Sequence, residues 1–284
     1  MASNWIAYND LAWTEDWFVN PCDYEKEVMF YINLINENAI ENPKTLLHFG
    51  SGAGGHDTIF KKYFSVTGVD LSLGMIEKAK NLHPDIVYIE GDMRTVRLNK
   101  KYDVVAIPDS IDYMVSEKDL EQAIRTAYIH LNANGVLLIV AKPKETFQNN
   151  NFAYTGEKNG IHITLLENNY INPFVPNTYE ATLVYLIREN KELSIHTERQ
   201  ILGLFPENTW ERIFIETGFT LNKSLLEDIY EKNIIGEGEY PLTVFVGRKN
   251  RLESLFLRRI PSKIANFLIR RITKCPVKDM GGFS

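Results

Sequence analysis

The chain contains the stretch Leu46-Leu47-His48-Phe49-Gly50-Ser51-Gly52-Ala53-Gly54-Gly55, in which an apolar run leads directly into a cluster of glycines. Residues 57–63 follow with the pattern of a helix, so the sequence predicts a strand, a tight turn and a helix. Glycine permits the sharp turn and lets the backbone approach a ligand where a Cβ atom would collide. The unpaired N–H groups at the start of the helix favour a nucleotide-like ligand.

The glycine spacing fits two kinds of cofactor site. Gly50, Gly52 and Gly55 satisfy the G-x-G-x-x-G pattern of dinucleotide sites, and Asp70 lies about twenty residues further on, where an acid for a ribose is expected. Gly50, Gly52 and Gly54 equally satisfy the G-x-G-x-G pattern of S-adenosylmethionine (SAM) sites. The motif by itself therefore leaves both cofactors open.

Length and composition are those of a globular protein. The 284 residues suffice for one α/β domain with an addition, or for two small domains. No stretch approaches the roughly 18–20 apolar residues of a transmembrane helix, and residues 1–10 lack the features of a signal peptide. We interpret Cys22 and Cys275 as reduced thiols, because neither has a metal-binding or C-x-x-C spacing. These features predict a cytoplasmic protein.

The charge is unevenly distributed along the chain. The formal net charge is −6, but ten Lys/Arg and two acids give residues 248–284 a charge of +8, which leaves −14 on the rest. An acidic body argues against nucleic acid as a partner. In residues 250–284, apolar side chains at helical spacing alternate with basic ones. This amphipathic tail is expected either to pack on the domain or on a second subunit of a homodimer, or to contact an anionic membrane or an acidic partner.

Short apolar runs alternate with helical patterns over the first half of the chain. This alternation predicts a doubly wound α/β fold with a parallel, Rossmann-like sheet. Before it, residues 1–24 are rich in aromatic side chains, which either pack the following helix onto the domain or form a lid over a ligand. The expected strands are residues 45–49, 65–69, 86–90, 102–107 and 136–140.

The pattern changes after Lys142. Residues 144–160 are polar and are expected to form a mobile loop. Three stretches with period-two alternation, 161–170, 178–189 and 193–204, predict a small inserted antiparallel sheet. We therefore expect an aromatic cap and helix at 1–40, an α/β core at 41–143, an inserted substrate-side sheet at 144–205, a return to the core at 206–249 and a basic tail at 250–284.

Two acids follow neighbouring strands of the expected sheet. Asp70 ends the second strand and Asp92 follows the third, and in an open α/β sheet these positions line one crevice. SAM presents a ribose diol, an adenine amine and an amino-acid tail. Asp70 can accept two hydrogen bonds from the diol, Asp92 can accept one from the amine, and Met93 can offer its backbone N–H to the ring.

Five motifs in register resemble the class I SAM-dependent methyltransferases. They are residues 46–54, Gly-Val-Asp-Leu-Ser-Leu-Gly-Met at 68–75, Glu-Gly-Asp-Met-Arg at 90–94, the run from Tyr102 to Met114, and Leu-Asn-Ala-Asn-Gly-Val-Leu-Leu at 131–138. The inserted strands and a tyrosine after the fourth strand further resemble a small-molecule group that includes amino-sugar N-methyltransferases and glycine N-methyltransferase. The resemblance implies SAM as cofactor, held by Gly50, Gly52, Gly54, Asp70, Leu71, Met75, Asp92, Met93 and the carbonyl of Ile107.

The sequence departs from this family at His48. The family usually has Asp or Glu at this position, two residues before its first glycine, where the acid helps to hold the methionine amino group. Here the imidazole either is buried with partners of its own or contacts the cofactor directly, and the acid comes from elsewhere.

Three residues are candidates for the chemistry at the acceptor. Asp109 and Tyr113 follow the fourth strand, where the reacting methyl group is expected. Asp109 would orient an amine or cap a turn, and Tyr113 is expected to pack and donate a hydrogen bond rather than act as a base. His196, on the inserted sheet, is a weaker candidate for a substrate contact or a base.

The resemblance implies methyl transfer to a small-molecule acceptor. The chain shows no certain general base, which favours an amine nitrogen over a hydroxyl oxygen. The alternatives are an O-methyltransferase, a SAM-binding accessory protein without catalysis and, outside this family, an NAD-dependent oxidoreductase. No metal is expected, because the sequence shows no carboxylate and histidine cluster at ligand spacing.

Overall fold

The computed structural model describes residues 5–18, 21–227 and 229–250. The chain divides into two compact units, residues 1–249 and 250–284, and only the first is described below. The predicted amphipathic tail, with Cys275, lies outside the described residues. Within the described part of the chain, no helix has both the length and the apolar character needed to cross a membrane.

The core is a seven-stranded sheet with the strand order β10-β11-β5-β4-β1-β2-β3. Neighbouring strands from β1 to β5 are parallel, which confirms the expected doubly wound arrangement. β11 runs antiparallel to both β5 and β10, so the complete sheet is mixed. The strands are β1 (Thr45–Phe49), β2 (Ser65–Asp70), β3 (Val87–Glu90), β4 (Tyr102–Ile107), β5 (Leu131–Ala141), β10 (Phe219–Leu226) and β11 (Leu242–Lys249).

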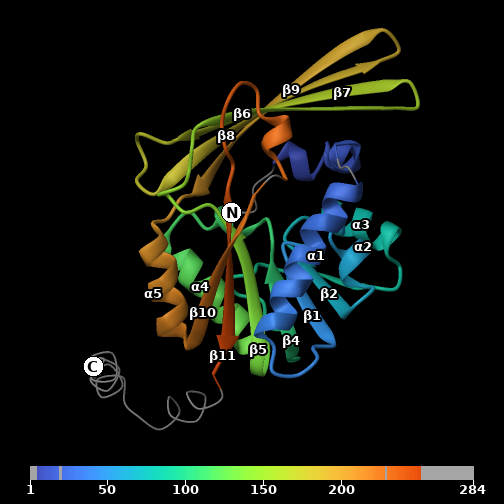
Figure 1. Cartoon of the computed structure of the whole chain (residues 1–284). Coiled ribbons are helices and arrows are strands. Elements are labelled where there is room, and N and C mark those ends of the chain that lie inside the picture. Colours follow the sequence, from blue (N-terminus) through green and yellow to red (C-terminus); the bar gives the residue numbers. More distant parts are fainter. Residues whose placement is uncertain (1–4, 19–20, 228, 251–284) are drawn as a thin grey trace, which may run out of the picture. The chain divides into compact units, whose positions relative to one another are not determined.

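Helices cover both faces of this sheet (Figure 1). Val104 of β4 packs in one buried cluster with side chains of α1 and α3, whereas its neighbour Val105 packs in a second cluster with α4 and α5. Successive side chains of a strand point to opposite faces, which explains why these strands are apolar along their whole length. The helices are α1 (Pro21–Asn38), α2 (Asp57–Phe60), α3 (Leu73–Leu82), α4 (Glu117–His130) and α5 (Glu207–Thr217).

A separate four-stranded antiparallel sheet has the order β6-β7-β8-β9. It lies beyond one end of the main sheet, beside the N-terminal segment (Figure 1). The strands are β6 (Asn150–Lys158), β7 (Ile161–Ile171), β8 (Thr178–Glu189) and β9 (Glu192–Gly203), and four short 3-10 helices complete the described elements: η1 (Ile6–Tyr8), η2 (Ala12–Trp17), η3 (Ile111–Tyr113) and η4 (Glu231–Asn233).

The expectation of a mobile loop over residues 144–160 is wrong for most of its length. Residues Asn150–Lys158 form β6, which pairs with β7 along its whole length. The strand is an edge of its sheet, where polar residues are common. Backbone pairing with β7 and burial of Phe152, which is 1% exposed, outweigh the polar composition from which the loop was expected.

Candidate active site

The turn after β1 requires glycine. Gly50 has φ +65°, and a Cβ atom there would lie 1.9 Å from Ser110 Oγ. Gly52 has φ +53° and open space where a Cβ would stand. The backbone N–H groups of Gly50 and Ser51 both donate to the carbonyl of Val69, at 2.8 and 3.1 Å. The loop is thereby held in a left-handed conformation against the end of β2.

Asp70 is positioned by backbone donors at the end of β2. Its carboxylate accepts from the N–H of Gly52 and from the N–H of Ser72, each at 2.8 Å. Ser72 caps α3 by accepting from Met75 N, and its hydroxyl donates to the carbonyl of Tyr8 at 2.7 Å. One carboxylate therefore ties the glycine turn, the next helix and, through Ser72, the N-terminal segment into one rim.

Asp92 is held by Arg94 after β3. The guanidinium of Arg94 contacts both carboxylate oxygens of Asp92, and it also reaches Asp119 of α4 at 2.9 Å. Hydrogen bonds from Arg94 hold the pKa of Asp92 below its usual range, so this carboxylate stays charged. The carboxylate can accept a hydrogen bond from a donor such as an exocyclic amine.

These loops surround a cavity of about 860 Å³, the cofactor cavity. Two of the residues expected to bind cofactor do not line it. Gly54 (φ +82°) faces His83 and Tyr88 and shapes the turn instead, and Ile107 is fully buried in β4. The expected residues that do line the cavity are Gly50, Gly52, Asp70, Leu71, Met75, Asp92 and Met93, together with Asp109 and Tyr113.

A second cavity of about 300 Å³, the acceptor cavity, lies between the ends of β4 and β5 and the second sheet. Every second residue of β8 from Tyr179 to Tyr185 lines it, because these side chains share one face of the strand. The two cavities have four lining residues in common: Tyr8, Glu15, Asp109 and Tyr113. A group transferred from one cavity to the other would pass this boundary.

The acceptor cavity is acidic. Its described lining residues carry four carboxylates, on Glu15, Asp109, Asp112 and Glu167, against one ammonium, on Lys142. Lys142 Nζ already pairs with Asp112 at 2.9 Å. Burial alone would lower the pKa of Lys142, but Asp112, Tyr179 and Tyr240 together outweigh it and raise that pKa. A net negative lining of this kind favours a positively charged acceptor.

The N-terminal segment packs on the second sheet and contributes lining residues to both cavities. Ala7 and Leu11 pack against the second sheet in one buried cluster. Trp5 and Tyr8 line the cofactor cavity, and the ring of Trp5 lies 4.8 Å from that of Tyr113. The Tyr8 and Tyr113 hydroxyls hydrogen-bond to each other. The segment thus packs on the second sheet, and its role as a lid over a ligand stays a prediction from the sequence.

The two tyrosines at the boundary do not fit the role of a base. Burial raises the pKa of Tyr113 and of Tyr8 well above the ordinary value for a phenol. Both hydroxyls therefore remain protonated near neutral pH. Tyr113 can donate or accept a hydrogen bond, but as a neutral phenol it cannot act as a general base.

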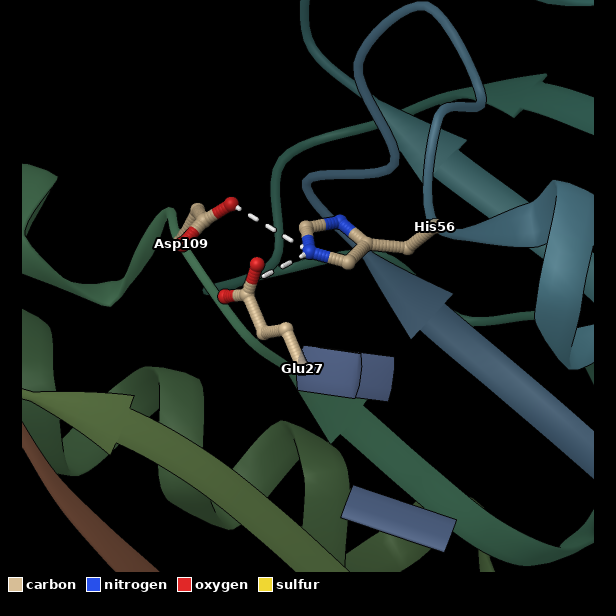
Figure 2. Close-up of side chains that lie close together, drawn as sticks. All are labelled: Glu27, His56 and Asp109. Carbon is tan, nitrogen blue, oxygen red and sulfur yellow. Dashed lines mark ion pairs between the residues drawn. The ribbon is translucent and has the colours of Figure 1, made fainter. Parts of the chain in front are cut away.

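A cluster that the sequence did not indicate lies at the wall of the cofactor cavity. Figure 2 shows the Nε2 atom of His56 between the carboxylates of Glu27 and Asp109, at 3.9 and 3.6 Å. The three residues come from α1, from the loop that precedes α2 and from the loop after β4. No signal in the sequence connects these segments, although His56 directly follows the glycine cluster.

The charges in this cluster shift the pKa values of one another. Burial alone would lower the pKa of His56, but Asp109 and Glu27 outweigh it and raise that pKa to about 9. Glu27 Oε1 also accepts hydrogen bonds from Tyr31 at 2.6 Å and Tyr230 at 2.9 Å. Each of the three side chains offers one possible metal-ligand atom, and these atoms lie within 4.8 Å of one another. The sequence did not predict such a group of potential metal ligands.

His48 is buried and has its own partner. Its side chain is 1% exposed, and Nδ1 lies 2.8 Å from Asp57 Oδ1. Asp57 also accepts a hydrogen bond from Tyr88 at 2.9 Å and is fully buried. Neither residue lines either cavity. Of the two alternatives for His48, the structure has the buried, paired histidine.

His196 lies in β9 opposite Tyr185 and lines neither cavity. Its side chain shares a sheet face with Tyr185, which lines the acceptor cavity, but His196 lies nearer the start of β9 than Gln200 and Leu202, the β9 residues that line the cavity. The structure therefore does not bring His196 together with Asp109 and Tyr113.

Part of the chain is similar in sequence to methyltransferases. Residues 46–135 match a family model described as a methyltransferase domain. A dTDP-3-amino-3,4,6-trideoxy-α-D-glucopyranose N,N-dimethyltransferase of Streptomyces venezuelae is 32% identical over 119 residues, 41% of this chain and 50% of that protein. A dTDP-3-amino-3,6-dideoxy-α-D-glucopyranose N,N-dimethyltransferase of Streptomyces fradiae is 26% identical over 211 residues, 70% and 78% of the two chains. The match thus spans half the length of the first relative.

Solved structures share the fold over a longer part of the chain. DesVI of Streptomyces venezuelae has a TM-score of 0.68 at 23% identity, covering 80% of this chain and 92% of that one. The sugar N-methyltransferase KedS8 of a Streptoalloteichus species has a TM-score of 0.69 at 20% identity, covering 80% and 88%. At these identities the likeness establishes a common fold.

The titration of His56 predicts a pH-dependent stability. Its folded-state pKa of about 9 exceeds the ordinary 6.5, so protonated His56 stabilises the fold fully below pH 6.5 and ceases to do so as the pH rises past 9. Relative to His56→Asn, the wild type should lose roughly 3 kcal/mol of unfolding free energy over that interval. Urea unfolding at several pH values measures the difference. His196→Asn is the control, and equal pH dependence of wild type and His56→Asn would contradict the prediction.

Proposed function

We propose that the chain is a class I SAM-dependent methyltransferase and that it methylates an amine nitrogen of a small-molecule acceptor. The observation that carries the proposal is the meeting of the cofactor cavity with a small acidic cavity at Asp109 and Tyr113. The first cavity has the donors and acceptors that SAM requires, and the second favours a cationic acceptor.

On the cofactor side, Asp70 and Asp92 carry the specific contacts of the proposed site. Asp70 lies where it can accept from a ribose diol while its other lone pairs hold Gly52 N and Ser72 N. Asp92 and Met93 would contact the adenine, and Leu71 and Met75 line the same cavity with apolar surface. SAM, when bound, supplies an electrophilic methyl group, so the protein's main tasks are orientation and exclusion of water.

On the acceptor side, we propose an amino sugar as the class of substrate. Two of the most similar relatives are N,N-dimethyltransferases of dTDP-linked amino sugars. The acidic lining of the acceptor cavity supports an amine, and the cavity's tyrosines offer ring faces and hydroxyls to a polyol. Tyr113, at the boundary, would orient the nitrogen.

Amine methylation agrees best with the groups available. An amine that loses its proton to water carries the lone pair needed for attack, whereas a hydroxyl acceptor needs a base in the site. The boundary tyrosines stay protonated, as argued above. O-methylation and a non-catalytic SAM-binding role are less favoured, and an NAD-dependent oxidoreductase is not supported by the methyltransferase domain match.

A cytoplasmic location is likewise our proposal, based on the sequence composition. Contact of the basic C-terminal segment with a second subunit, an anionic membrane or an acidic partner remains a prediction from the sequence.

The choice of cofactor is testable by calorimetry. The protein should bind S-adenosylhomocysteine and not NAD, and Asp70→Ala should weaken that binding about 10–100-fold because two hydrogen bonds to a charged group are lost. Asp85→Ala is the control, since Asp85 is an exposed acid that pairs with Lys61 outside the cavities. Binding of NAD without S-adenosylhomocysteine would overturn the assignment.

The choice of acceptor is testable with paired compounds. A 3-amino sugar should be methylated, and the same sugar with a hydroxyl in place of the amine should react at least about 100-fold more slowly, since the boundary tyrosines stay protonated and cannot serve as the base that a hydroxyl needs. Release of S-adenosylhomocysteine measures both rates. Equal rates would favour O-methylation, and no release with any amine or hydroxyl would favour the accessory role.

Tyr113→Phe separates orientation from base catalysis. The substitution removes hydrogen bonds to Tyr8 and to Gln200, so kcat/KM should fall about tenfold with the pH profile unchanged. Tyr63→Phe, at a 50% exposed position, is the matched control. A loss of about a thousandfold together with a missing limb of the pH profile would show that Tyr113 is a base after all.

A further inference from the structure

The cofactor cavity receives no carboxylate from β1. The residue at the position where the resembling family has an acid is His48, which is buried, paired with Asp57 and outside the cavity. Asp57 cannot replace that acid, because it is 0% exposed and its two oxygens are used by His48 and Tyr88. Any carboxylate that binds the amino-acid end of the cofactor therefore comes from another element.

The cluster of Glu27, His56 and Asp109 supplies one at the cavity wall (Figure 2). His56 lines only the cofactor cavity, whereas Asp109 lines both cavities and has a side chain that is 52% exposed. The Nε2 atom of His56 is buried and has no partner at hydrogen-bonding distance among the described residues. The cluster is thus open toward the cofactor and incomplete in its hydrogen bonding.

The charges of this cluster and its fixed side chains suit a zwitterionic amino-acid group, which has an ammonium beside a carboxylate. Burial raises the pKa of Asp109, and the positive charge of His56 acts against that rise. With His56 protonated and both acids ionised, the cluster carries one excess negative charge, which is the complement of an ammonium group. Glu27 is fixed by Tyr31 and Tyr230, and the ring of Tyr24 stacks on His56 with centroids 4.7 Å apart. His56 is therefore a fixed positive group beside a negative one, as a zwitterionic amino acid requires.

We propose that Asp109, oriented by His56 and Glu27, binds the α-ammonium group of the amino-acid tail of SAM and so replaces the acid that β1 lacks. This inference rests on the proposed function. Neither His56 nor Glu27 lines the acceptor cavity, so Asp109 is the one member of the cluster that faces both cavities, and we assign its carboxylate to the cofactor. His56 and Glu27 are positioning residues, and the direct contact is assigned to Asp109.

Calorimetry with two ligands tests the assignment. S-Adenosylhomocysteine carries the amino-acid tail, and 5′-methylthioadenosine has the same nucleoside without it. Asp109→Asn should weaken S-adenosylhomocysteine binding about tenfold or more and change methylthioadenosine binding less than about twofold, because only the charge-assisted contact is lost. Retained methylthioadenosine binding also shows that the variant is folded. Glu27→Gln should act in the same direction.

Glu15→Gln is the matched control, because Glu15 also lines both cavities. A selective loss with Glu15→Gln in place of Asp109→Asn would overturn the assignment, as would an equal loss of both ligands with Asp109→Asn. Abolition of wild-type binding by EDTA and its recovery with zinc would show that the cluster is a metal site instead. If the wild type binds neither ligand, the proposed function itself fails.

Discussion

The parallel pairing of β1 with β2 and β4 is the constraint on which the site depends. Phe49 lies opposite Val69, and His48 lies opposite Ala106, so the carboxyl ends of the three strands lie together on one side of the main sheet. Backbone hydrogen bonds from the glycine turn to Val69 continue the ladder into the loop. The loops that carry Asp70, Asp92 and Asp109 therefore leave the same edge and surround one cavity, although the sequence separates them by tens of residues.

Electrostatics give the two cavities different tasks. Along the cofactor cavity, acids are held singly by backbone donors or by an arginine, as at Asp70 and Asp92. In the acceptor cavity, carboxylates outnumber the one lysine. Between them stand two phenols that burial keeps protonated. The protonated phenols at this boundary can position a ligand but cannot take its proton, which agrees with the proposed transfer by orientation.

Much of the fold could be predicted from local patterns. The strands at 45–49, 102–107 and 178–189 have the predicted bounds, because apolar runs and period-two alternation report burial directly. β6 was missed because its conformation depends on pairing with β7 and on its position at the edge of the sheet. Neither produces an apolar pattern that could be recognised in this polar sequence. His196 was considered because of its residue type, but its place on the strand puts it away from the cavities.

The sequence by itself determined the cofactor cradle, since glycines, Asp70 and Asp92 belong to short motifs whose spacing implies their geometry. Only the tertiary structure revealed which side chains form a charged cluster beside the cofactor cavity, where β1 provides no acid. Glu27, His56 and Asp109 are brought together by the packing of α1 against the sheet and by the common edge of β1 and β4. Long-range packing of this kind has no period and no fixed spacing along the chain, so no local pattern of residues could predict it.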